Sequence, residues 1–151
     1  MKVTKKGEYA VKALLALTFT YGDRTVNLRE IAGQEKIPYK FLEQIMILLK
    51  KAGFIQSVQG KHGGYSLSRS PKEITLGQVI RTIEGPLSPL GTVTEIRKRI
   101  QSDSQHAGLY QAFLEVRDAI AEILDKKTLA EICEKSLELS GSKSPYQMYY
   151  I

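Results

Sequence analysis

Residues 38–67, PYKFLEQIMILLKKAGFIQSVQGKHGGYSL, decide the fold that the sequence predicts. They begin with apolar residues at helical spacing, which Gly53 ends, and continue as two alternating segments, 55–58 and 65–68. The basic loop between these segments, 59–64, contains three glycines. A helix fits the major groove and a narrow loop can follow the phosphates or the minor groove, so this order is typical of a winged helix-turn-helix. The sequence therefore predicts a DNA-binding protein that is mainly α-helical with a small β-wing.

The charge of the chain is unevenly divided. Within a net charge of +6, residues 1–86 carry 14 Lys or Arg against 7 Asp or Glu, whereas residues 87–151 carry 8 against 9. A basic first half favours a polyanionic partner, because neutralising phosphates releases counterions. On charge alone, the alternative is a basic surface that keeps the protein soluble.

Composition excludes several other classes. The 151 residues suit one compact domain, or a small domain with an added helical element, and contain no apolar run of about 18 residues. The N-terminus also lacks the features of a secretory signal, so we expect a cytoplasmic protein without membrane contacts. A lone cysteine, Cys133, cannot form an internal disulfide or a CxxC metal site, and we expect no metal and no cofactor.

Capping signals place further helices around the central segment. Thr4 can cap a first helix that Gly22 ends, and Asn27 with Glu30 marks the start of a second. The segment 33–37 then makes the turn, and Pro38 fits the first turn of the third helix. A capping box at 75–78 predicts a fourth helix, which the Gly- and Pro-rich stretch 85–91 interrupts.

The third helix has two faces. Its predicted buried stripe consists of Phe41, Leu42, Ile45, Leu48, Leu49 and Ala52. The opposite face consists of Tyr39, Lys40, Glu43, Gln44, Ile47, Lys50 and Lys51. Long polar side chains there can read base edges while the lysines reach phosphates, and a merely solvated face is the alternative for any one residue. At the tip of the wing, Lys61 and His62 are the side chains left to touch a surface, and His62 has no metal partner nearby.

We predict a winged helix-turn-helix domain over residues 1–86, a linker or loop over 87–108, and a dimerisation helix followed by a C-terminal helix and tail over 109–151. The linker contains a short basic helix around residues 93–100 and a polar loop at 101–108. A long amphipathic helix follows, whose apolar face is Leu109, Ala112, Phe113, Val116, Ile120, Ile123 and Leu124. A second copy can cover this face, and folding back on the first domain is the alternative. A last helix begins at Thr128 and packs Cys133, and the apolar tail 145–151 docks on the body or on a partner.

These residues resemble the IscR/NsrR/CymR type of bacterial winged-helix transcription regulators. The resemblance spans nearly the whole chain and is most specific from Ser57 through Gly63, Gly64 and Tyr65 to Glu84. It implies a homodimer that crosses its long helices and binds a partly palindromic operator, with repression the commoner outcome. The candidate DNA contacts are Thr4, Lys6, Tyr9, Asn27, Pro38, Tyr39, Lys40, Glu43, Gln44, Lys50, Gln59, Gly60, Lys61, His62, Gly63 and Gly64.

Two departures from the family pattern refine this expectation. Family members that sense iron, nitric oxide or redox state hold an iron–sulfur cluster with three cysteines after the fourth helix, and residues 86–108 contain none. Gln59 stands where the wing usually carries an arginine, so Lys61 is expected to substitute for it. The chain is therefore most similar to the branch without cluster cysteines, which includes the repressor of cysteine metabolism. In that branch the signal arrives through a partner enzyme, O-acetylserine sulfhydrylase.

Other readings stay open. Cys133 as a redox sensor is one, although its place on a packed helix face gives no sign of a reactive thiolate. An enzyme is not expected, because the two histidines lie far apart in the sequence and no nucleophile is paired with a base. The more serious alternative is a winged helix that binds protein or RNA and has no DNA operator.

Overall fold

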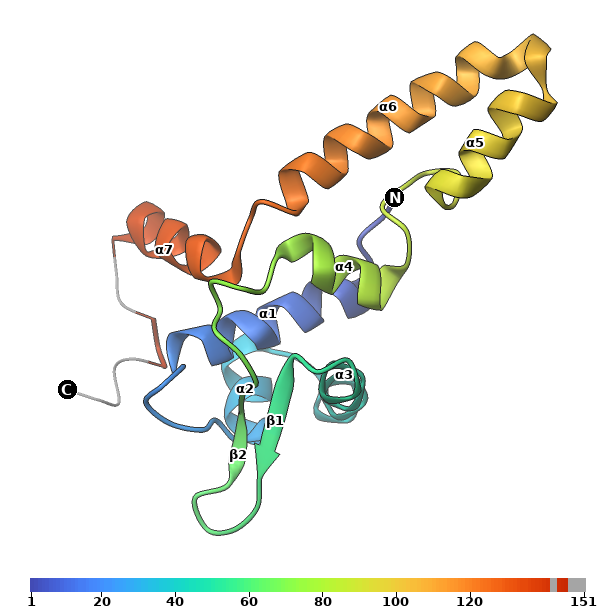
Figure 1. Cartoon of the computed structure of the whole chain (residues 1–151). Helices are drawn as coiled ribbons and strands as arrows, with labels where there is room; N and C mark the ends of the chain where they lie inside the picture. The colour runs from blue at the N-terminus through green and yellow to red at the C-terminus, as the bar shows by residue number, and fades with distance from the viewer. Residues whose placement is uncertain (142–143, 147–151) are drawn as a thin grey trace.

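The computed structural model describes residues 1–141 and 144–146 and consists of a body and an arm that projects from it (Figure 1). A compact body contains α1 (Lys5–Phe19), α2 (Leu28–Glu35), α3 (Tyr39–Lys51), β1 (Ile55–Val58), β2 (Gly64–Leu67), α4 (Leu76–Glu84) and α7 (Leu129–Ser140). A long arm contains α5 (Val93–Ser102), the 3₁₀ turn η1 (Ser104–His106) and α6 (Ala107–Leu124). This arrangement confirms the predicted class, mainly helical with a small two-stranded wing. Within the described ranges, no helix is long and apolar enough to cross a membrane.

The predicted caps begin their helices as expected. The Thr4 side chain accepts a hydrogen bond from the Gly7 N–H, and that of Asn27 accepts one from the Glu30 N–H. At α4 the capping box is complete, because Thr75 and Gln78 bond each other's backbone N–H groups. These caps satisfy N–H groups that a helix start leaves without partners. α1 ends at Phe19, three residues before Gly22, which lies in the following turn with φ 84°.

The helix-turn-helix differs from the prediction at its turn. α2 continues through Gly33 to Glu35, and Lys36 makes the turn instead, in the left-handed conformation with φ 55°. Pro38 is the N-cap of α3 and so stands one residue before the predicted position. The buried side of α3 consists of Leu42, Ile45, Met46 and Leu49. Leu48 and Ala52, expected in that stripe, are exposed. The buried side of α3 is rotated toward Met46 and away from these two residues.

The wing is an antiparallel hairpin in which Ile55 pairs with Leu67 and Val58 with Gly64. A short bridge adds a third segment, because Val26 and Tyr65 exchange backbone hydrogen bonds of 2.9 and 2.8 Å. The loop before α2 is thus docked on the base of the wing. Next to the base of the wing, the main core joins buried residues of α1, α2, α3 and β2.

The arm is a helical hairpin that extends away from the body (Figure 1). The polar stretch 101–108, predicted as a loop, instead forms the end of α5, η1 and the first residues of α6. The prediction failed there because polarity alone does not exclude an exposed helix. At its body end, α6 packs Ala121 against Ile80 and Leu87. A bidentate pair joins the arm to α4 at the same place, with Arg81 Nη1 and Nη2 lying 2.7 and 2.8 Å from the carboxylate oxygens of Asp125.

The chain returns to the body after the arm. α7 packs on α1, and both Leu129 and Tyr146 belong to the main core. Residues 129–140, together with Tyr146, therefore pack on the body. Of the tail 145–151, expected to dock on the body or on a partner, Tyr146 is buried in the body, and residues 147–151 lie outside the described residues.

Candidate nucleic-acid interface

The outward face of α3 carries most of the predicted base-reading residues. Tyr39, Lys40 and Gln44 are exposed, and Glu43 is half-buried with its carboxylate 3.8 Å from Lys40 Nζ. Their spacing of three or four residues places them on one side of the helix. The face therefore offers an amide, a carboxylate and an ammonium group, the chemical groups that discriminate base edges.

Two other residues of the outward face of α3, Lys50 and Ile47, add to this description. Lys50, expected to reach phosphate, is exposed and donates to Ser57 Oγ at 2.7 Å, which ties α3 to β1. Ile47 stands on the same outward face as Gln44 and is 65% exposed. Ile47 was not among the candidate contacts. An apolar residue at a polar-face position was the signal that could have identified it, because apolar side chains contact the thymine methyl group in the major groove.

The wing presents a basic tip on a backbone that is closely packed. Gln59, Gly60, Lys61 and His62 are exposed. Gly63 and Gly64, predicted to contact DNA, are half-buried and face their own chain. A Cβ on Gly63 would lie 2.3 Å from the Val58 carbonyl oxygen, and one on Gly64 would lie 2.7 Å from that of Val26. In this structure these two glycines allow the hairpin to close and to dock, and the tip residues are left for an external surface.

The tip is fastened to the loop before α2. The Thr25 hydroxyl donates to the His62 carbonyl oxygen at 2.9 Å. A polar hollow lies beside this bond, lined by Arg24, Thr25, Asn27, Glu30 and residues 61–63. No local sequence signal predicts this contact, because Thr25 and His62 are 37 residues apart.

The candidates near the N-terminus have structural contacts in the body. The Thr4 N–H and hydroxyl both donate to Glu84 Oε1, which joins the start of α1 to the end of α4. Tyr9 packs edge-on against Phe41, with ring centroids 5.7 Å apart, and so holds α1 against α3. Lys6 is half-buried on α1, and Asn27 is exposed at the cap of α2.

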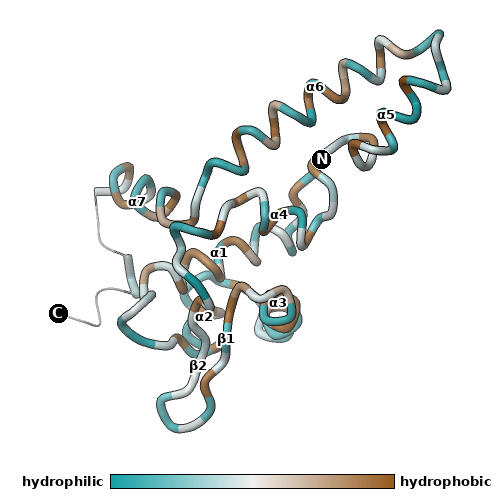
Figure 2. Tube along the Cα trace, in the orientation of Figure 1, coloured by the Kyte–Doolittle hydropathy of each residue, from teal (hydrophilic) through white to brown (hydrophobic). Residues whose placement is uncertain are grey.

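The apolar stripe of α6 is divided between two faces. Ile120 and Leu124 pack on the body cluster around Ile80 and Leu87, and Phe113 is half-buried. Leu109, Val116 and Ile123 are 52, 48 and 59% exposed. With the exposed Ala112 and Ala119 they form what we call the α6 seam: Leu109, Ala112, Val116, Ala119 and Ile123. The alternation of hydrophobic and hydrophilic residues along α6 is visible in Figure 2. Spacings of three and four residues make this seam a heptad-type surface.

Cys133 is buried on α7, as predicted, with its Sγ 3.7 Å from the Leu15 carbonyl oxygen. Burial raises the pKa of this thiol to about 12, so it stays protonated at neutral pH.

We therefore expect Cys133 to be unreactive in the folded protein. With a pKa that high, a thiol reagent at pH 8 should modify it at least about a thousandfold more slowly than free cysteine, and should modify it fully in denaturant. Absorbance of the released thiolate measures both rates. Rapid modification of the native protein that also changes DNA binding would revive the redox-sensor hypothesis.

The described residues contain no group of three or more His, Cys, Asp or Glu side chains that could hold a metal ion. The chain between α4 and α5 carries no cysteine, and Cys133 lies on α7 with its thiol against α1. An iron–sulfur cluster needs thiolate ligands, so these side chains do not fit one.

Comparisons with known proteins agree with this geometry. The family model described as Rrf2, iron-dependent transcriptional regulator, matches residues 3–135. The transcriptional regulator CymR of Bacillus subtilis is 30% identical over 149 residues, 99% of each chain. A solved structure of CymR, the global cysteine regulator of B. subtilis, has a TM-score of 0.76 at 31% identity and covers 89% of this chain and 98% of that one. The structure of T. potens IscR gives 0.73 at 33% identity, covering 99% and 97%. The CymR relative is named a transcriptional regulator, which supports the expectation that this chain is not an enzyme.

Proposed function

This chain belongs to the Rrf2 family of transcriptional regulators, and from that premise we propose that it is a homodimer that represses transcription from a partly palindromic operator. DNA binding and transcription regulation are the common property of the family members that it matches. The homodimer, the operator symmetry and the repression are the parts proposed here. The observation that carries the proposal is the outward face of α3, which places Lys40, Glu43 and Gln44 on the element that a helix-turn-helix inserts in the major groove.

In the proposed complex, Glu43 and Gln44 contact base edges, while Tyr39 and Lys40 contact the backbone at the start of α3. Ile47 lies on the same face and contacts a thymine methyl group. The tip of the wing, Gln59–His62, follows the adjacent minor groove or its phosphates. Thr4, Lys6, Tyr9 and Asn27 support this surface from the body, and Lys6 and Asn27 are close enough to solvent to contact phosphate as well.

The α6 seam is the proposed contact with the second protomer. Five apolar side chains at heptad spacing are exposed on a helix that extends from the body, and a second copy of the seam can bury them symmetrically. Two copies of α3 then face one duplex, and half-sites separated by one or more helical turns, about 34 Å each, match them.

The regulated genes are proposed to be those of cysteine or sulfur metabolism. The full-length match to CymR and the likeness to the structure of that global cysteine regulator support this choice. The proposed effector is a partner protein, O-acetylserine sulfhydrylase being the first candidate, because the chain lacks the thiolates with which cluster-containing relatives sense their signals.

The proposed absence of a cluster gives a direct prediction. Protein purified without oxygen should contain much less than one iron and one sulfide per chain, because residues 86–108 provide no thiolate. Metal and sulfide analysis of the purified protein measures this. Stoichiometric iron and sulfide would contradict it.

The tip of the wing gives a second prediction. Lys61→Ala should weaken operator binding by about threefold to tenfold, because Lys61 supplies the positive charge that the wing lacks at Gln59. Gln59→Ala, the neighbouring control on the same exposed loop, should weaken it less. Titration of both variants against one labelled operator compares them, and equal losses would contradict the assignment to Lys61.

The experiment that tests the proposed function is the isolation of all DNA that the protein binds in its own cell. Recovery of a shared, partly palindromic sequence upstream of genes for sulfur metabolism is the expected result. The purified protein should then prefer that duplex to a scrambled one at equal salt. A winged helix that acts as a protein- or RNA-interaction module would show no such preference.

A further inference from the structure

The last described segment, Ser144–Tyr146, is buried at two of its three residues although it lies near the C-terminus. Ser144 is 5% exposed and Tyr146 is 2% exposed. The Tyr146 ring belongs to the main core, and the segment lines a cavity of about 280 Å³ together with residues of α1, α2 and α7. The segment Ser144–Tyr146 is therefore part of the body that carries α2 and α3.

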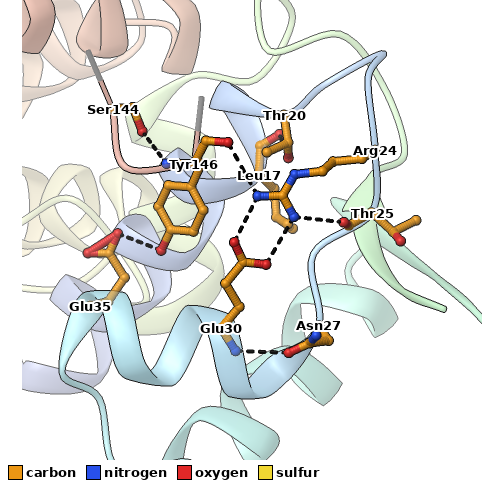
Figure 3. A network of polar contacts seen from close by, with 9 residues as sticks. All are labelled: Leu17, Thr20, Arg24, Thr25, Asn27, Glu30, Glu35, Ser144 and Tyr146. Carbon is orange, nitrogen blue, oxygen red and sulfur yellow. Dashed lines mark hydrogen bonds and ion pairs between the residues drawn. The ribbon is translucent and has the colours of Figure 1, made fainter. Parts of the chain in front are cut away.

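Tyr146 contacts α2 and the loop before it at separate points (Figure 3). Its hydroxyl donates to Glu35 Oε1 at 3.1 Å, at the end of α2. Its carbonyl oxygen accepts a hydrogen bond from Arg24 Nη2 at 3.3 Å. Burial raises the pKa of the Tyr146 phenol, so it remains a neutral donor at physiological pH.

Arg24 extends the contact toward the first turn of α2. Its two terminal nitrogens lie 2.9 and 2.8 Å from the carboxylate oxygens of Glu30, in a bidentate pair whose side chains are only about one-fifth exposed. Arg24 Nη1 also donates to the Thr25 carbonyl oxygen. The guanidinium thus joins the tail, the start of α2 and the loop 24–26, as Figure 3 shows.

Thr25 carries the connection to the wing. Its hydroxyl donates to the His62 carbonyl oxygen at 2.9 Å, and the next residue, Val26, pairs with Tyr65 of β2. A continuous series of hydrogen bonds therefore runs from Tyr146 through Arg24 and Thr25 to the wing.

We propose that Tyr146, Arg24 and Thr25 are positioning residues that couple the C-terminal segment to the wing. The segment holds Arg24, Arg24 holds the loop 24–26, and that loop holds the wing in its DNA-binding position. A poorly hydrated group that loses a hydrogen-bond partner is left unsatisfied, which costs free energy. When Tyr146 is displaced, we therefore expect Arg24 to shift from its present position, and the loop 24–26 to loosen with it. The DNA part of this inference rests on the proposed function, but the coupling itself is a property of the free protein.

Amide hydrogen exchange, resolved by residue, tests the coupling without DNA. The Val26 and Tyr65 amides report on the docking of the wing, and the Ser68 amide, bonded to the Phe54 carbonyl, reports on the far end of the same hairpin. Tyr146→Ala removes the buried ring and the hydroxyl that seat the segment, which displaces its carbonyl oxygen from Arg24. It should therefore accelerate exchange at Val26 and Tyr65 by about tenfold relative to Ser68, the effect of losing one or two hydrogen bonds. Thr25→Val, which keeps the shape of the side chain, should give a similar acceleration. Because both act through one connection, the double variant should show less than the product of the two effects.

Two further variants separate coupling from general destabilisation. Leu129→Ala empties part of the same core from α7 and leaves the hydrogen-bond series intact, so it should not change the ratio of exchange rates. Tyr146→Phe removes only the hydroxyl bonded to Glu35 and keeps both the ring and the carbonyl oxygen bonded to Arg24, so it should leave the ratio nearly unchanged. If the alanine variant does not fold, Thr25→Val still tests the connection, because its ratio should rise while that of Leu129→Ala does not. The proposal would be overturned if Tyr146→Ala and Leu129→Ala gave the same ratio of exchange rates. It would also be overturned if the acceleration in the double variant equalled the product of the accelerations caused by Tyr146→Ala and Thr25→Val.

A DNA titration completes the test. Tyr146→Ala should lower operator affinity by about tenfold while the dimer persists. If no duplex is bound selectively by the unchanged protein, the proposed function fails and the exchange ratios still decide the coupling. If exchange accelerates and operator affinity does not change, the wing is not positioned for DNA by this route, and the DNA part of the inference is wrong.

Discussion

Val116→Glu is expected to convert the proposed dimer to a monomer. Val116 lies in the middle of the α6 seam, and a symmetric interface contains it twice, so one substitution buries two unpaired charges. Glutamate keeps α6 helical, which confines the effect to the seam. The dimer dissociation constant should rise at least about a hundredfold, or about 3 kcal/mol.

Operator binding should fall with the dimer. Two linked α3 helices bind two half-sites with a high effective concentration, so losing the link should weaken operator binding by about a hundredfold or more. Sedimentation equilibrium measures the first effect and a DNA titration the second. Gln111→Glu is the matched control, because it places the same residue on an exposed position of α6 outside the seam. If the Val116→Glu protein stayed dimeric, the dimer interface could not be this seam.

Gly63→Ala is expected to misplace the wing. The added Cβ would lie 2.3 Å from the Val58 carbonyl oxygen and 2.9 Å from that of Gly60, and both are backbone atoms. The hairpin must open to admit it, at a cost of about 1–3 kcal/mol of stability. The tip then leaves its position beside Thr25, and operator affinity should fall by about tenfold or more while general affinity for DNA falls less.

The control for this substitution is Gly33→Ala. Gly33 lies inside α2 with no atom near its Cβ position, so alanine should raise stability by about 0.5–1 kcal/mol. Urea unfolding gives both stability changes, and titration with operator and scrambled duplexes gives the affinities. Normal operator binding by Gly63→Ala would show that closure of the hairpin does not position the wing.

Local signals in the sequence were sufficient for the helix starts and the hairpin of the body. The caps at Thr4, Asn27 and Thr75 lie where the residue pairs predicted them, because each involves residues three apart and no distant partner. The hairpin 55–67 also followed from alternation and from the glycines between its strands. The candidate contacts at the start of α3 are exposed for the same reason, since the helix has a strong apolar side.

Contacts between distant residues were not predictable in this way. The bonds of Thr25 to His62 and of Tyr146 to Glu35 join segments far apart in the sequence. Some apolar residues of α6 pack on the body and others form the exposed seam, and a periodic pattern does not show which residues belong to which group. The close approach of Gly63 and Gly64 to backbone carbonyls of Val58 and Val26 is another contact of this kind, which a loop sequence does not reveal.

The most direct test of the DNA-binding dimer is the mass of the protein–DNA complex in solution. Sedimentation of the unchanged protein with its selected operator should give two chains per duplex, with an affinity that falls steeply as salt rises and exceeds that for a scrambled duplex. A single chain per duplex, or equal affinity for both duplexes at every salt concentration, would contradict it.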